Sequence, residues 1–290
     1  MENDLFFSSM DEDCLMGTRV DRDFEYTEGG KYFNHNLKKL NLQDYNMVIM
    51  RLPRPLSDYF LIWLDSLFPD TVIINSPSGI MTTGSKQYLI NVPELCPEIK
   101  LCYSIEEIEK ESEKHPIVLK PLKEYGGKGI LKIVGNRLSD GMEEFNARTY
   151  LQEIKETIEK DGLLSMKYLK NVTQGDKRIL VVGGEILAAS MRLPAKGSWL
   201  CNVAQGGTSE FTEVTRKERE IIKILSPKLE KLGILIYGAD TLVDDNGERV
   251  LSEINTLSIG GFPQAEAQTG KPIVRSLIDK IIEYADEWTR

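Results

Sequence analysis

Three oxygen-bearing side chains near the C-terminal end of the sequence have the spacing of a metal site. The alternating segment 249–255 places Glu253 and Asn255 on one face of a strand, because successive side chains of a strand point to opposite faces. Asp240 closes the preceding apolar run, and the turn sequence Asp245-Asn246-Gly247 predicts a hairpin between the two segments. Carboxylate and amide oxygens suit Mg²⁺, which completes its octahedron with water and substrate phosphates. We therefore expect a bound nucleotide nearby; the alternative is a surface hairpin with solvated acidic residues.

A glycine-rich loop and two lysines supply groups that bind phosphate. The loop Gly126-Gly127-Lys128-Gly129 is predicted to join two strands, 117–120 and 130–134, which excludes the Walker and Rossmann motifs because both lead from a strand into a helix. Its backbone N–H groups can fold over phosphates, although an ordinary hairpin turn has the same composition. Lys120 ends an apolar strand, where a buried ammonium is costly unless an anion compensates it. Lys86 can approach the same site, or it is one more surface lysine.

Two arginines stand beside neighbouring predicted strands. Arg178 precedes the apolar run 179–182, and Arg192 follows the next strand. Paired guanidinium groups can hold a transferring phosphoryl group or a developing oxyanion, because the planar fork matches both. Each arginine alone is better explained as a solubilising strand end. Asn202 and the turn that contains Gly206 and Gly207 follow, and these glycines allow close substrate approach or form a plain loop.

The surrounding sequence alternates strands and helices. A strand at 47–50, a helix at 58–67 and a strand at 71–74 predict a parallel β-α-β unit. Ser104 and Glu107 predict a capping box at the start of a helix that runs to Lys114. The other predicted elements are a strand at 5–7, a hairpin around 16–26, a helix over 143–161, and two strands within 179–189 that turn at 183–184.

Composition excludes several classes of protein. The 290 residues carry a formal charge of −9 with a pI near 5.0, which argues against nucleic-acid partners. No apolar run reaches the roughly 18 residues of a membrane span, and from the acidic, polar start of the sequence we expect no signal peptide. The four cysteines lack a CxxC pair and only two histidines are present, so we expect no zinc site, no disulfides and a cytoplasmic location.

In this order, the motifs resemble the ATP-grasp superfamily and, within it, the prokaryotic glutathione synthetases. The resemblance covers residues 45–290. Segments 49–51, 72–77 and 84–86 of the first unit also match the family. It implies an α/β protein of ATP-grasp fold, with ATP held between two α+β lobes. The implied domains are an N-terminal pre-ATP-grasp unit at 1–92, a small lobe at 93–165 and a large lobe at 166–290. The first unit is expected to be shortened, without its first strand and helix.

The resemblance also assigns roles to residues. Those expected to bind ATP are Lys86, Lys120, Gly126, Gly127, Lys128 and Gly129 at the phosphates, Met166, Lys167 and Leu169 at adenine, and Asp176 at the ribose. Asp240, Glu253 and Asn255 are implied as ligands of Mg²⁺, with Mn²⁺ as an alternative. Arg178 and Arg192 are implied to stabilise the acyl-phosphate step. Asn202, Gly206, Gly207, Gly260 and Gly261 are expected to contact the substrates.

The implied activity is a ligase reaction on amino-acid or peptide substrates. A carboxylate attacks the γ-phosphate of ATP, and an amine then displaces phosphate from the acyl phosphate. The first hypothesis is glutathione synthesis from γ-glutamylcysteine and glycine. The second is ligation of another amino acid or peptide. A small-molecule kinase and a degenerate nucleotide-binding protein remain as alternatives. The resemblance also implies a homo-oligomer.

Three departures from the family pattern concern the substrates and the hinge. Leu200-Cys201 precedes Asn202 where the family usually has an arginine, and residues 256–261 replace a Ser-Pro-Thr-Gly turn. Met166-Lys167 replaces the acid or amide that the family carries in the hinge, the segment between the two lobes whose backbone contacts adenine. The ATP and metal motifs are retained.

Overall fold

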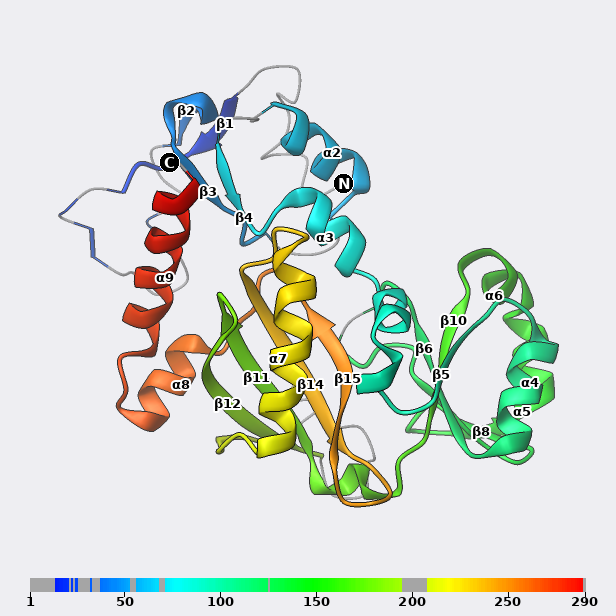
Figure 1. Ribbon diagram of the computed structural model, residues 1–290. Coiled ribbons are helices and arrows are strands. Elements are labelled where there is room, and N and C mark those ends of the chain that lie inside the picture. The colour runs from blue at the N-terminus through cyan, green and yellow to red at the C-terminus, as the bar shows by residue number, and fades with distance from the viewer. Residues whose placement is uncertain are drawn as a thin grey trace.

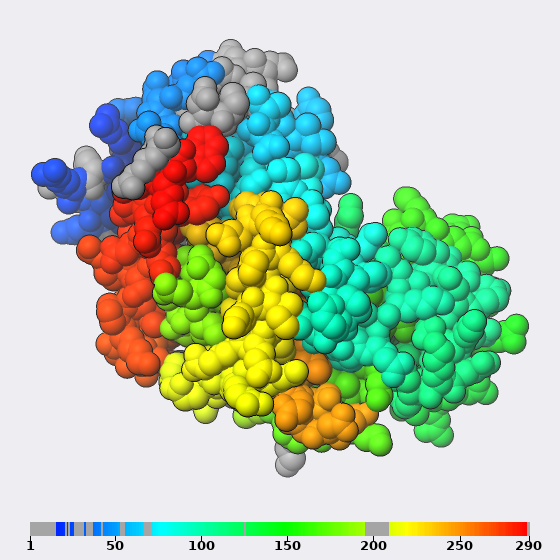
Figure 2. Space-filling view, in the orientation of Figure 1, coloured from blue at the N-terminus to red at the C-terminus, as the bar shows by residue number. Residues whose placement is uncertain are grey.

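The computed structural model describes residues 14–20, 22, 24–25, 32, 37–52, 56–67, 71–124, 126–194 and 208–288. Their strands form two larger sheets and two small ones; in Figure 1 the N-terminal unit lies above the large lobe and the small lobe lies to its right. Figure 2 shows the small lobe as a separate protrusion on one side of the molecule. No helix of the described residues is long and apolar enough to cross a membrane.

The N-terminal unit contains the predicted β-α-β arrangement. Strand β3 (Met47–Ile49) lies parallel to β4 (Val72–Ile74), and they are joined through α2 (Asp58–Leu67) and followed by α3 (Pro77–Thr83). This confirms the expected parallel pair. The predicted hairpin at 16–26 is wrong, because β1 (Cys14–Gly17) pairs with β2 (Lys38–Asn41), which is much further along the chain. The predicted strand at 5–7 lies outside the described residues.

The small lobe is built on an antiparallel sheet whose strands lie in the order β5-β10-β6-β7-β8-β9. Its strands are β5 (Ile99–Cys102), β6 (Ile117–Pro121), β7 (Leu131–Val134), β8 (Arg137–Ser139), β9 (Glu144–Asn146) and β10 (Leu163–Lys167). Its helices are α4 (Ile105–Lys114), α5 (Ala147–Glu153) and α6 (Lys155–Asp161). Short 3₁₀ helices at Lys86–Asn91 and Pro93–Leu95 lead into this lobe. From the sequence, the small lobe is expected to end at residue 165. Strand β10 ends at Lys167, so the sheet of this lobe extends two residues further.

Two local predictions for the small lobe need correction. The single helix expected over 143–161 begins with strand β9 and is interrupted at Ile154, so it becomes two short helices. At α4, Ser104 Oγ accepts from Glu107 N as expected, but Glu107 Oε2 accepts from Tyr103 N, one residue before the cap. The capping box is therefore only half formed. The β6–β7 hairpin around the glycine loop is confirmed.

The large lobe carries the second antiparallel sheet, in the order β13-β12-β11-β14-β15. Its strands are β11 (Asp176–Val182), β12 (Glu185–Leu193), β13 (Thr208–Phe211), β14 (Ile236–Val243) and β15 (Arg249–Asn255). Helices α7 (Arg216–Glu230), α8 (Phe262–Thr269) and α9 (Ile273–Trp288) pack against it, and a 3₁₀ helix at Lys170–Gln174 connects the lobes. The hairpins predicted at 183–184 and 245–247 are both present.

One apolar core joins the three units. It contains Leu64 of α2, Leu89 before the small lobe, Met166 of β10, and Val181 and Leu225 of the large lobe. Separate clusters fill the small lobe and the space beneath α8 and α9. A shared core of this kind holds the sheets at a defined separation, because close-packed side chains resist sliding.

Candidate active site

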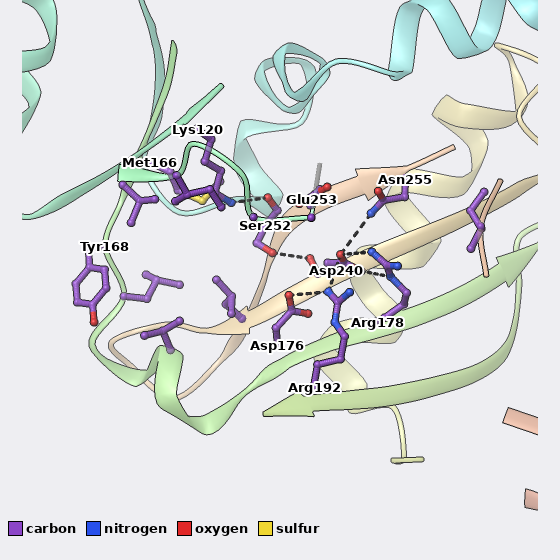
Figure 3. Close-up of a pocket in the computed structure, with 18 of the residues that line it drawn as sticks. Lys120, Met166, Tyr168, Asp176, Arg178, Arg192, Asp240, Ser252, Glu253 and Asn255 are labelled. Atoms are coloured by element: carbon purple, nitrogen blue, oxygen red, sulfur yellow. Dashed lines mark hydrogen bonds and ion pairs between the residues drawn. The ribbon is translucent and has the colours of Figure 1, made fainter. Parts of the chain in front are cut away.

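A cavity of about 320 Å³ opens where the two large sheets face each other. The small lobe contributes Lys120, Gly126 and Gly127 and the end of β10, the segment after β10 contributes Tyr168 and Leu169, and the large lobe contributes strands β11, β12, β14 and β15. Figure 3 shows Lys120 approaching from the small lobe and a chain of charged side chains over the large sheet. The cavity thus gathers residues separated by more than a hundred positions in the sequence.

Asp240 is the centre of the charged chain. Arg178 donates from Nε to Asp240 Oδ1 at 2.8 Å and from Nη2 to Oδ2 at 2.7 Å. Arg192 Nη2 donates at 2.7 Å both to Asp240 Oδ2 and to Asp176 Oδ2. Asn255 Nδ2 also donates to Asp240 Oδ2, at 3.3 Å. Figure 3 marks these contacts as dashed lines between side chains of the large sheet.

Burial and the neighbouring charges shift the pKa values of the Asp240 and Asp176 carboxyl groups. Burial alone raises the pKa of Asp240, but the adjacent Arg178 and Arg192 outweigh it and hold the value well below the usual range. For Asp176, burial and the neighbouring Asp240 carboxylate raise the pKa to about 6, against the opposing effect of Arg192. Within the described residues, Asp176 Oδ1 and Arg192 Nε are buried without a hydrogen-bond partner. Buried polar atoms of this kind mark a site that is completed by a ligand or by water.

A β-bulge in β15 provides the carbonyl that Lys120 contacts at the same cavity. Asp240 pairs with Glu253 and Thr241 pairs with Leu251, so Ser252 is an extra residue in β15. The Ser252 carbonyl accepts from Lys120 Nζ at 3.1 Å, and its hydroxyl donates to the Asp240 carbonyl at 3.1 Å. Lys120, which is only 7% exposed, is therefore oriented across the gap between the lobes.

The side chains of Asp240, Glu253 and Asn255 fit a hard divalent cation. Asp240 and Glu253 are direct cross-strand partners, and Asn255 lies two residues further on the same face as Glu253. All three line the cavity, and they offer only oxygen ligands or an amide. No group of three His, Cys, Asp or Glu side chains suited to a metal occurs in the described part of the chain. A cation here needs Asn255, water or phosphate to complete its coordination.

Thirteen of the predicted site residues line this cavity. They are Lys120, Gly126, Gly127, Met166, Lys167, Leu169, Asp176, Arg178, Arg192, Asp240, Glu253, Asn255 and Gly260. Asp240 does not close its apolar run as expected, since β14 continues to Val243 and places it inside the strand.

Other predicted residues lie elsewhere. Lys86 Nζ donates to the Glu124 carbonyl, and Lys128 lines a neighbouring cavity of about 410 Å³ that also contains Leu257. Gly129 and Gly261 do not line the main cavity. The φ angle of Gly129 is +67°, and a Cβ there would lie 3.0 Å from Pro121 Cγ, so its role in the loop is conformational. Asn202, Gly206 and Gly207 lie outside the described residues.

The apolar wall was not predicted from the sequence, and in the loop after β15 only Gly260 and Gly261 were predicted as site residues. The wall contains Val118, Ile130, Val172 and Leu242, whose apolar side chains line the same cavity as the charged cluster. Val118 could have been found, because it lies two residues before Lys120 on the same strand face. The same signal points to Leu242, two residues after Asp240 on β14, but not to Val172, which lies in the 3₁₀ helix that connects the lobes.

Residues 257–260 form a second wall, in which Leu257, Ser258 and Ile259 were not predicted as site residues. Ser258 has a φ of +52°, and its hydroxyl donates to the Leu52 carbonyl at 2.7 Å. Arg51 Nη1 donates to the Ile259 carbonyl at 3.0 Å. Two residues of the N-terminal unit thereby hold this loop against the cavity. Sequence distance concealed the relationship, because about 200 residues separate the partners.

Comparison with known proteins points to one group of enzymes. The family model for the prokaryotic glutathione synthetase ATP-grasp domain matches residues 85–270. A glutathione synthetase of Bradyrhizobium diazoefficiens is 29% identical over 85% of this chain and 75% of its own length. One from Rhodopseudomonas palustris is 27% identical over 88% and 79%.

Solved structures agree with this fold. D-cycloserine synthetase DcsG aligns with a TM-score of 0.64 at 11% identity, over 85% of this chain and 86% of that one. D-alanine–D-alanine ligase from Bacillus anthracis, complexed with ATP, aligns with a TM-score of 0.57 at 14% identity, over 84% and 82%. At such low identity the likeness concerns the fold alone.

Proposed function

Because the chain belongs to the prokaryotic glutathione synthetase family of ATP-grasp ligases, we propose that it joins γ-glutamylcysteine to glycine in a reaction driven by ATP. The chain is an ATP-dependent ligase that acts on small molecules. The single structural observation that supports the ATP-driven reaction is the cavity in which Lys120 of the small lobe faces the Arg178–Asp240–Arg192 cluster of the large lobe.

The nucleotide is proposed to lie along this cavity. Met166 and Leu169, together with the apolar wall, suit the faces of adenine, and backbone groups of 166–169 suit its polar edge. Asp176 Oδ1 is a buried acceptor without a partner among the described residues, which suits a ribose hydroxyl. Lys120 and the N–H groups of Gly126 and Gly127 are proposed to neutralise the phosphates. Lys86 and Lys128 are proposed to join them when the loop closes.

Asp240, Glu253 and Asn255 are proposed to hold Mg²⁺, or Mn²⁺ in its place. When bound, the cation neutralises the phosphate oxygens and orients them for transfer. The oxygen-only donor set and the direct pairing of Asp240 with Glu253 support this assignment.

Arg178 and Arg192 are proposed to bind the negative charge that develops during transfer. The substrate carboxylate oxygen attacks the γ-phosphorus, the bond to the β-phosphate oxygen breaks, and an acyl phosphate and ADP form. The amine nitrogen then attacks the acyl carbon, releases phosphate and loses a proton. Each step requires a fixed cation near the reacting oxygens, and the guanidinium forks are already oriented by carboxylates.

The substrate is proposed from the relatives rather than from the cavity. Asn202, Gly206, Gly207, Gly260 and Gly261 are proposed to contact the two substrates. Loop 257–260, held by Arg51 and Leu52, is proposed to receive the amine. We also propose a cytoplasmic homo-oligomer; the free thiols of Cys96 and Cys102 agree with a reducing compartment, and light scattering would measure the assembly.

The experiment is a phosphate-release assay with ATP, Mg²⁺, γ-glutamylcysteine and glycine, with the product identified by mass. Release that requires both substrates and yields the tripeptide supports the proposal. Release that requires only the first substrate, with a stable phosphorylated product, identifies a kinase instead. Ligation of a different amino acid, with no activity on glycine, would support the assignment as a ligase but contradict the proposed substrate.

A further inference from the structure

A carboxylate that the proposed reaction does not use lies directly beneath the site. Glu218, in the first turn of α7, is 0% exposed. Its Oε2 accepts from Lys177 Nζ at 2.9 Å and from the backbone and hydroxyl of Thr215 at 2.8 and 2.9 Å. Its Oε1 accepts from the Thr241 hydroxyl at 2.7 Å. Arg249 Nε lies 3.8 Å from the same oxygen. One side chain thus contacts strands β11, β14 and β15.

These contacts occur on the face of the sheet opposite the cavity. Lys177 pairs with Thr241, and the next residues in the two strands, Arg178 and Asp240, pair with each other. Because side chains alternate, Lys177 and Thr241 point toward α7 while Arg178 and Asp240 point into the cavity. Moving Thr241 therefore moves Asp240, to which it is covalently joined.

The β-bulge makes the position of Asp240 depend on the contacts of Thr241. The register of β14 against β15 shifts between Asp240 and Thr241, so the Asp240–Glu253 pair is the last one before the bulge, and the ladder to β15 does not continue regularly on its Thr241 side. The Thr241 hydroxyl bond to Glu218 and the Thr241 carbonyl, which accepts from Arg249 Nη1 at 3.0 Å, fix the chain at that point.

Holding α7 against the sheet does not itself require charge. Replacing a buried ion pair with apolar side chains of similar volume is often neutral or stabilising, and α7 already buries Ile221, Ile222, Leu225 and Leu229. A buried carboxylate that hydrogen-bonds the residue next to Asp240 instead provides a directional constraint.

We propose that Glu218 is a positioning residue that acts through the Thr241 hydroxyl to hold Asp240 at the distance from Glu253 that a divalent cation requires. The proposal rests on the metal site of the proposed function and is independent of which substrates are joined. Partners that orient metal ligands from behind typically change metal affinity when they are removed.

Two substitutions at Thr241 separate the hydrogen bond from packing. Thr241→Val keeps the branched shape and removes the hydroxyl, whereas Thr241→Ser keeps the hydroxyl and removes the methyl group. The measurement is the affinity for Mn²⁺ in the presence of saturating ADP, by electron paramagnetic resonance. We expect Thr241→Val to weaken Mn²⁺ binding about tenfold or more, and Thr241→Ser to bind near the parent value. Equal affinity of the Val variant and the parent would overturn the proposal, as would a Ser variant weakened as much as Val.

Controls distinguish positioning from loss of stability. Ser104→Ala removes a helix cap in the small lobe, where it should lower the melting temperature without changing Mn²⁺ affinity. ADP binding in EDTA should be the same for the Val variant and the parent. If Thr241→Val does not fold, the comparison of Thr241→Ser with Thr241→Ala tests the same hydroxyl. A parent protein that binds ADP but no Mn²⁺ would refute the metal site itself, and the positioning role with it.

Discussion

Arg178 and Asp240 form a two-pronged ion pair across neighbouring strands, with N–O distances of 2.8 and 2.7 Å. Such parallel charge-assisted hydrogen bonds fix both position and orientation. Asp240 is also the carboxylate proposed to bind the cation. In the protein alone, Asp240 Oδ2 already accepts hydrogen bonds from Arg178, Arg192 and Asn255, so a cation that coordinates this oxygen must displace at least one of these donors.

This relationship predicts that metal and nucleotide bind cooperatively. Phosphates offer Arg178 and Arg192 new anionic partners, so the nucleotide lowers the cost of releasing Asp240 to the metal. We expect Mn²⁺ to bind at least about tenfold more tightly with ADP than without it, measured by electron paramagnetic resonance. By reciprocity, Mn²⁺ should tighten ADP binding by the same factor. Identical Mn²⁺ affinities in the two conditions would contradict the exchange of partners.

Glu253→Gln should reduce turnover with little change in stability. Glu253 is a half-buried strand residue that lines the cavity, and the amide keeps its shape while removing the charge that attracts the cation. We expect turnover to fall on the order of a hundredfold and the free energy of unfolding to change by less than about 0.5 kcal/mol. Steady-state kinetics and denaturant unfolding measure the two quantities. Glu248→Gln, on the exposed turn of the same hairpin, is the matched control, and an unimpaired Glu253→Gln enzyme would remove the metal assignment.

Lys120→Met should weaken nucleotide binding and leave the nucleotide-free protein equally or more stable. Methionine fills a similar volume without a buried charge, and Lys120 loses only its bond to the Ser252 carbonyl. A hydrogen bond between charged groups contributes roughly 1.5–3 kcal/mol, so the dissociation constant for ADP should rise about tenfold or more. Titration calorimetry and thermal melting test both parts. Lys110→Met, on the exposed side of α4, should change neither, and unaltered ADP affinity in Lys120→Met would argue against phosphate contact.

Acid should destabilise the protein partly through Glu218. Burial alone raises the pKa of Glu218, but hydrogen bonds from Lys177, Thr215 and Thr241 outweigh it and leave the pKa below its ordinary value of 4.5. A carboxyl group with a lowered pKa in the folded state stabilises the fold above its unfolded pKa, and that stability is lost as the pH falls through the folded pKa.

The matched comparison is Glu218→Gln, which cannot titrate at this position. At neutral pH the parent should be the more stable protein, and the difference should shrink as the pH falls below about 4.5. Urea unfolding at a series of pH values gives the difference directly. A difference that stays constant from neutral pH to acid would show that Glu218 titrates with the same pKa in both states.

Local pattern was enough to predict many elements. Helix α2 has the predicted bounds Asp58–Leu67, because its apolar residues follow helical spacing and Pro and Asp flank it. The β6–β7 and β14–β15 hairpins were also predicted, since glycine turns between apolar runs are strong local signals. The helix expected over 143–161 failed at its first residues, where pairing of β9 with β8 overrides helix propensity.

The sequence by itself determined the chemical types at the site and the order of the motifs, because strand periodicity and turn chemistry are properties of neighbouring residues. It predicted that Asp240, Glu253 and Asn255 share a region, and that Lys120 belongs with a phosphate-binding loop. Only the tertiary structure decided that Arg178 and Arg192 both hold Asp240, that the extra residue Ser252 turns its carbonyl to Lys120, and that Glu218 supports Thr241 from behind. These contacts depend on strand register and on packing between distant segments, which no local pattern specifies.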